Sequence, residues 1–95
     1  MTDRIMTLHP QGKSGVNIDR GKYDAIRQAI LDAAQAHGEI TFKELTEDVR
    51  RRVGGQFDGS TNWYVTTVKL DLEARGAIER IPGSSPQRLR LATTT

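Results

Sequence analysis

The residues near the C-terminus that are best suited to chemistry are basic and polar, and they lie between positions 80 and 90. Arginine, serine and glutamine side chains commonly donate hydrogen bonds to phosphate oxygens in complexes with DNA. The alternative interpretation is a solvent-facing strand whose arginines serve solubility and pair partly with Glu79. We favour phosphate contacts from six side chains of this segment: Arg80, Ser84, Ser85, Gln87, Arg88 and Arg90.

A second set of polar residues lies in the segment "STNWYVTTVKLDLEARG", Ser60 to Gly76. An asparagine such as Asn62 can bond the edge of an adenine at two atoms, and threonine methyl groups can contact the methyl group of thymine. Against base reading, asparagine and threonine are ordinary solvated residues near a helix start, and this segment has no arginine before Arg75. The candidate base-contacting residues are Thr61, Asn62, Thr66, Thr67 and Lys69.

No constellation typical of catalysis or metal binding is found in the sequence. The chain has no cysteine, and its two histidines, His9 and His37, are isolated from carboxylates on their own helix face. Covalent catalysis needs a base beside its nucleophile, and a metal site needs several ligands at suitable spacing. We therefore expect no enzymatic activity, no metal site and no cofactor.

The motif "GKS" at positions 12–14 suggests a phosphate-binding loop only at first sight. The full loop motif would need a glycine at the position of Thr7. No buried strand is expected before it and no helix directly after it to supply backbone amides. We interpret the motif as a basic turn whose Lys13 can touch a DNA backbone.

The run "RRR" at positions 50–52 is interpreted mainly as a neutralised helix face. Glu47 precedes Arg51 by four residues and Asp48 precedes Arg52 by four, which is the orientation that favours ion pairs on a helix. Only Arg50 is left to reach a phosphate.

Composition and charge indicate one small globular domain but do not identify its binding partner. The 95 residues are 36% hydrophobic, and 14 basic residues against 12 acidic ones give a formal net charge of +2. That balance is too even to identify a nucleic-acid-binding protein by itself. The N-terminus has no continuous apolar run, and the absence of cysteine mildly favours a reducing compartment. We expect a cytoplasmic protein that spans no membrane.

Capping residues and apolar spacing predict three helices and three short strands. Asp19 and Gly38 bound the first helix, whose apolar stripe runs Tyr23, Ile26, Ile30, Ala33 and His37 at helical spacing. The pair Thr41 and Glu44 forms a capping box that opens the second helix. The predicted order is a helix over 19–38, a strand at 40, helices over 41–54 and 60–76, and strands over 77–81 and 88–91.

The segment "TVKLDLEARGAIER" resembles the part of bacterial winged-helix regulators, including the MarR type, that joins the recognition helix to the wing. Val65, Val68 and Leu72 stand where that pattern has core residues, Gly76 matches its helix stop, and Ile78 matches the first buried residue of the wing. The whole chain also resembles an uncharacterised family of stand-alone small bacterial winged-helix proteins. The resemblance implies an α+β winged helix-turn-helix, with three helices, a three-stranded antiparallel sheet and, here, an N-terminal arm.

The third helix carries a second apolar stripe, Trp63, Leu70 and Ala74, almost opposite its core stripe. Three explanations are open: contact with DNA, cover by the N-terminal arm, and an interface with a second copy or another protein. Leucine is a poor reader of bases, so we expect the arm to take at least part of the stripe, with Met6, Leu8 or Val16 against the indole.

Together these patterns predict an arm over residues 1–18 with a short strand near Thr7 and Leu8, a winged helix-turn-helix over 19–91 and a disordered tail over 92–95. The leading hypothesis is a transcriptional regulator that binds double-stranded DNA, with the wing on phosphates and the third helix on bases. The alternative is a protein–protein interaction module that does not bind DNA and uses Trp63, Leu70 and the arm, as a homodimer or with another partner.

Overall fold

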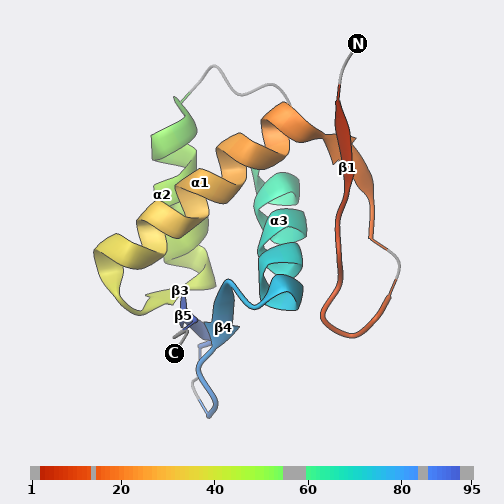
Figure 1. Ribbon diagram of the computed structural model, residues 1–95. Coiled ribbons are helices and arrows are strands. Elements are labelled where there is room, and N and C mark those ends of the chain that lie inside the picture. Colours follow the sequence, from red (N-terminus) through yellow and green to blue (C-terminus); the bar gives the residue numbers. More distant parts are fainter. Residues whose placement is uncertain (1–2, 14, 55–59, 84–85, 93–95) are drawn as a thin grey trace.

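A computed structural model of the chain describes residues 3–13, 15–54, 60–83 and 86–92. Within these ranges the order of elements is two strands, a helix, a strand, two helices and two strands. Figure 1 shows α1 crossing α2 and α3, a small sheet at one end of the helices, and the N-terminal hairpin beside α3. The elements are β1 (Arg4–Met6), β2 (Asn17–Asp19), α1 (Arg20–His37), β3 (Ile40–Thr41), α2 (Phe42–Val53), α3 (Thr61–Arg75), β4 (Ile78–Arg80) and β5 (Arg88–Leu91).

The first helix begins and ends at the predicted residues. The Asp19 carboxylate accepts a 2.9 Å hydrogen bond from the backbone N–H of Lys22, and Gly38 ends the helix with a φ of 75°. Such an angle favours glycine. Tyr23, Ile26 and Ile30 are buried, as their spacing predicts, so α1 supplies the central layer of the core.

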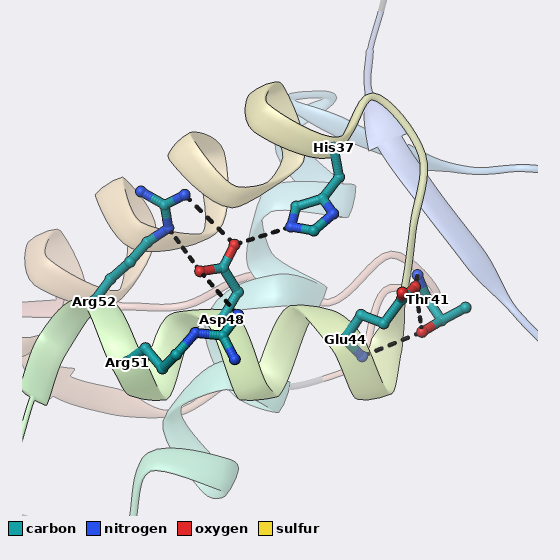
Figure 2. A network of polar contacts seen from close by, with 6 residues as sticks. All are labelled: His37, Thr41, Glu44, Asp48, Arg51 and Arg52. Carbon is teal, nitrogen blue, oxygen red and sulfur yellow. Dashed lines mark hydrogen bonds and ion pairs between the residues drawn. The ribbon is translucent and has the colours of Figure 1, made fainter.

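The second helix opens with the predicted capping box, which is drawn in Figure 2. The Thr41 hydroxyl accepts from the backbone N–H of Glu44 at 3.1 Å, and the Glu44 carboxylate accepts from the backbone N–H of Thr41 at 3.0 Å. These bonds to Thr41 hold the pKa of Glu44 below its usual value. Leu45 and Val49 then turn the inner face of α2 toward the core.

The third helix is capped by Ser60, whose hydroxyl accepts from the backbone N–H of Trp63 at 3.3 Å. Val65, Val68 and Leu72 are at most 1% exposed, which confirms the predicted core stripe. Gly76 adopts the left-handed conformation at the helix end, with a φ of 78°.

The three-stranded antiparallel sheet has the order β3-β5-β4. Ile40 lies opposite Leu89 and Ile78 opposite Leu91, so apolar residues from all three strands share the face toward the helices. The predicted strands at 40, 77–81 and 88–91 are confirmed within a residue or so at their ends. The resulting α+β arrangement is compatible with a winged helix-turn-helix.

The N-terminal segment forms a hairpin in which β1 pairs with β2, Ile5 opposite Ile18. The short strand predicted near Thr7 and Leu8 lies slightly earlier, over Arg4–Met6, and the pair Thr7 and Val16 follows it in the same register. The Thr7 backbone N–H donates to the Val16 carbonyl at 2.8 Å, and the Thr7 hydroxyl accepts from the Val16 backbone N–H at 2.9 Å. Ile18 is 3% exposed and joins the core, so the hairpin is anchored at its base.

None of the helices in the described part of the chain is long and apolar enough to cross a membrane. The predicted tail falls largely on residues 93–95, which lie outside the described residues. The division into arm, central domain and tail stays a prediction.

Candidate nucleic-acid interface

Three faces of α3 have different surroundings. The core stripe faces α1 and the sheet. A polar stripe of Asn62, Thr66, Lys69 and Glu73, at positions i, i+4, i+7 and i+11, faces α2 and the β4–β5 hairpin. The second apolar stripe lies on the side of the N-terminal hairpin. The candidate residues of α3 are therefore distributed over two surfaces, not one.

A hollow of about 290 Å³ lies between α2 and the first half of α3. Asn62 and Thr66 are both exposed at its edge. A terminal amino group of Arg50 donates a hydrogen bond to the Asn62 side-chain oxygen, and the Thr66 hydroxyl donates to the Asn62 carbonyl at 3.0 Å. We name this surface the α2–α3 hollow; its lining residues are Phe42, Lys43, Thr46, Glu47, Arg50, Asn62 and Thr66.

Lys69 does not belong to the exposed surface, because its side chain is 7% exposed. Its ammonium lies 3.4 Å from Oε1 of Glu73, donates to the Gln87 side-chain oxygen at 3.3 Å and lies 5.4 Å from the centre of the Phe42 ring. Burial lowers the pKa of Lys69, and the charge of Glu73 partly offsets this effect. Lys69 and Gln87 therefore link α3 to the β4–β5 hairpin.

Two of the three arginines of the β4–β5 hairpin, Arg80 and Arg90, are half-exposed and form ion pairs. Nε of Arg80 lies 2.9 Å from Oε1 of Glu73, and Nε of Arg90 lies 2.8 Å from Oε1 of Glu79, with the arginine side chains 51% and 44% exposed. The ion pair between Arg90 and Glu79 agrees with the alternative interpretation of the sequence, in which these arginines pair partly with Glu79. Arg88 is partly buried opposite Thr41. The predicted contacts Ser84 and Ser85 lie outside the described residues.

The N-terminal hairpin covers only part of the second apolar stripe. Thr67 and Leu70 line a hollow of about 100 Å³ together with Thr7, Leu8, His9, Gly15 and Val16. Ala74 is partly buried as well. Trp63 remains 44% exposed, with its ring edge-on to Tyr64 at 4.9 Å between centroids.

The expectation that an apolar residue of the arm buries the indole is therefore not met. Met6, Leu8 and Val16 are themselves 57%, 45% and 38% exposed. The hairpin meets the middle of α3, where Leu8 and Val16 line the hollow beside Leu70, and it does not extend over Trp63 at the helix start. Thr61 is partly buried at the helix start, and Lys13 is exposed at the turn of the arm.

Sequence reasoning missed Asp71, which is 0% exposed. Its carboxylate accepts a 2.8 Å hydrogen bond from the backbone N–H of Leu8, a 2.9 Å bond from Nε of Arg75 and a further bond from the Tyr23 hydroxyl. Burial and the hydrogen bond to Asp71 raise the pKa of Tyr23 to about 12. The sequence did contain a signal for this burial, because Asp71 lies between two leucines and four residues before Arg75.

Asp48 organises the basic run of α2, as Figure 2 shows. Its carboxylate lies 3.1 Å from Nε of Arg52, as predicted, and 3.6 Å from Arg51, which the sequence had assigned to Glu47. No carboxylate shares the helix face of His37, as predicted, but the residue is not isolated in the fold, because its Nε2 lies 3.2 Å from Oδ2 of Asp48 on the neighbouring helix. Asp48 therefore pairs with Arg51 and Arg52, whereas Arg50, the remaining arginine of the run, lines the α2–α3 hollow.

Among the described residues, no group of three or more histidine, cysteine, aspartate or glutamate side chains is placed to hold a metal ion. Searches of curated proteins and of solved structures found no significant similarity to the chain. The model of one family, described as a family of unknown function (DUF6958), matches residues 4–89, which is nearly the whole sequence. The chain belongs to this family.

Proposed function

We propose that the chain is a winged helix-turn-helix protein that binds double-stranded DNA and regulates transcription. The helix order, the β3-β5-β4 sheet and the β4–β5 hairpin after α3 support this assignment of the fold. In such proteins the start of the recognition helix lies nearest the base edges of the major groove. Here that helix is α3.

The observation that carries the proposal is the hydrogen bond between Arg50 and Asn62 at the edge of the α2–α3 hollow. The amide of Asn62 is suited to an adenine edge, and the exposed Thr66 places a methyl group one turn further along. Arg50 fixes the orientation of that amide and has further N–H donors to reach a phosphate. Lys43 adds a second positive charge to the same hollow.

The β4–β5 hairpin supplies further phosphate contacts in this proposal. Arg80 and Arg90 use Nε in the ion pairs described above. A guanidinium held at Nε can still direct its terminal amino groups to a phosphate, and the pair then fixes the direction in which it points. The positive charge that this hairpin presents to DNA is moderate, because Glu73 and Glu79 lie beside its arginines.

The test compares two variants in binding to a fluorescently labelled duplex of random sequence. The double variant Lys43→Ala/Arg50→Ala removes two phosphate contacts, so its affinity falls and the slope of log K against log salt becomes shallower by about 2. Arg27→Ala removes an exposed positive charge from α1, outside the hollow, and leaves the slope unchanged. Equal losses in both variants would mean that the α2–α3 hollow does not contact DNA.

A second function, protein–protein interaction without DNA binding, is favoured by the exposed apolar residues. Within the described residues the exposed large hydrophobic side chains are Met6, Leu8, Val16 and Trp63, all on the arm or at the start of α3. Such patches mark interaction sites in soluble proteins. Sedimentation velocity of the wild type and of Trp63→Ala tests this function: a dimer that Trp63→Ala converts to monomer supports it, and a monomer at every concentration rules out the homodimer.

A further inference from the structure

The β4–β5 hairpin is joined to the helices by apolar and by polar contacts. Ile78, at the start of β4, is buried in the core. Closer to the turn, Lys69 donates to the Gln87 side-chain oxygen at 3.3 Å, and Oε1 of Glu73 lies 2.9 Å from Nε of Arg80. Figure 1 shows β4 and β5 just beyond the end of α3. The core therefore fixes where the hairpin begins, and the two polar contacts bear on its direction beyond that point.

Lys69 and Glu73 form one buried unit on α3. Their side chains are 7% and 6% exposed, and the Lys69 ammonium lies 3.4 Å from Oε1 of Glu73, the oxygen that also binds Arg80. The same ammonium lies 5.4 Å from the centre of the Phe42 ring, which lines the α2–α3 hollow. The unit thus connects the β4–β5 hairpin on one side with that hollow on the other.

Stability alone does not explain this unit. Taking two charges out of water is costly, and a buried ion pair is often no more stabilising than apolar residues of similar volume. Oε2 of Glu73 adds to this cost, because it is shielded from solvent and has no hydrogen-bond partner among the described residues. What the pair adds is direction, because hydrogen bonds depend on angle as well as distance, whereas the hydrophobic effect is non-directional.

We propose that Lys69 and Glu73 are positioning residues for DNA binding, which hold the β4–β5 hairpin at a fixed angle to α3. Arg80 then reaches a phosphate of the same duplex that Asn62 contacts. Lys69 itself does not contact DNA, because its ammonium is buried. This inference rests on the proposed DNA binding and adds that the hairpin and the α2–α3 hollow act as one surface.

The first test uses the free protein, without DNA. In the double variant Lys69→Met/Glu73→Leu, apolar side chains of similar size replace both charges, and the net charge of the protein is unchanged. Residual dipolar couplings of backbone amides in β4, β5 and α3 report the angle between the hairpin and the helix. In the wild type one alignment tensor is expected to fit all three elements, and in the double variant the couplings of the hairpin should shrink or require a different tensor. Unchanged couplings would overturn the proposal.

A control and a second variant accompany this test. Gln28→Met/Asp32→Leu removes a hydrogen-bonded pair at the same i, i+4 spacing on α1 and should leave the couplings of the hairpin unchanged. If Lys69→Met/Glu73→Leu does not fold, Gln87→Ala removes the bond from Lys69 and keeps the buried pair. It should change the same couplings to a smaller extent, and wild-type couplings in Gln87→Ala would then overturn the proposal.

The second test asks whether this angle matters for DNA. In the wild-type background, Arg80→Ala removes one phosphate contact and makes the slope of log K against log salt shallower by about 1. The double variant Lys69→Met/Glu73→Leu should already show this loss, so that adding Arg80→Ala changes the slope no further. A change of about 1 in both backgrounds would mean that the pair does not position Arg80. A wild type that binds no duplex would contradict the proposed function, and the couplings of the free protein would decide separately whether the pair orients the hairpin.

Discussion

The backbone N–H of Leu8 donates a 2.8 Å hydrogen bond to Oδ1 of Asp71, a residue 63 positions away in the sequence. The same carboxylate binds the Tyr23 hydroxyl from α1 and Arg75 from the next turn of α3. One buried side chain thus joins the N-terminal arm to two helices. The arm is held to α3 by this polar centre, while Trp63 on the same side of the helix stays half-exposed.

Replacing Asp71 with alanine is expected to destabilise the protein by about 2–4 kcal/mol, because the Tyr23 hydroxyl and the Leu8 N–H lose a buried acceptor. Chemical denaturation followed by circular dichroism measures the change. Asp24→Ala removes an exposed carboxylate from α1 and should change the free energy of unfolding by about 0.5 kcal/mol or less. Similar losses in the two variants would show that Asp71 does not organise the arm.

Tyr23 makes stability depend on alkaline pH. Its pKa is raised from 10.0 to about 12 in the folded protein, so the folded state keeps a proton that the unfolded chain releases. This contribution to stability is fully present below pH 10 and is lost as the pH rises through 12, by about 2–3 kcal/mol in total. Absorbance of tyrosinate should show an ionisation near pH 12 that Tyr23→Phe abolishes and Tyr64→Phe retains. A late ionisation that survives Tyr23→Phe would contradict the assignment.

Gly15 is expected to tolerate no side chain. A Cβ at this position would lie 1.7 Å from the Thr7 carbonyl oxygen, which is backbone and cannot move without opening the hairpin. Gly15→Ala should therefore increase hydrogen exchange at the amides of Thr7, Leu8 and Val16. Gly21→Ala, in the first turn of α1, meets only a carboxylate oxygen of Asp19 at 3.1 Å and should leave these amides protected. Unchanged exchange in Gly15→Ala would mean that the hairpin is not packed as described.

Lys69 and Glu73 should behave as a coupled buried pair. Glu73→Ala leaves the Lys69 ammonium buried without its counter-charge and should cost about 3 kcal/mol of stability. Adding Lys69→Met to that variant removes the stranded charge and should recover about half of the loss. Double-mutant analysis of denaturation curves measures the coupling. Losses that simply add would show that the two side chains do not depend on each other.

The helices could be predicted from the sequence because their signals are local. The caps at Asp19, Thr41 and Ser60 and the apolar stripe of Val65, Val68 and Leu72 act within one or two helical turns. The strand positions followed in the same way, since Leu89 and Leu91 alternate with arginines.

The polar interior could not be predicted, because its partners come from distant segments. Asp71 depends on Tyr23 and Leu8, and Lys69 depends on Gln87 across the turn of the hairpin. A single charged residue in a helix is ordinarily assigned to the surface. The hydrogen bond between Arg50 and Asn62 likewise joins two different helices, and the sequence within each helix does not indicate how the two lie relative to each other.

The central claim, that this chain binds DNA, is tested most directly by fluorescence anisotropy with a labelled random-sequence duplex across a salt series. The proposal predicts association with a dissociation constant of about 10⁻⁴–10⁻⁶ M that weakens steeply as salt rises, since phosphate contacts release counterions. A flat signal even at the lowest salt concentration would contradict DNA binding and would leave the exposed surface around Trp63 as the functional one.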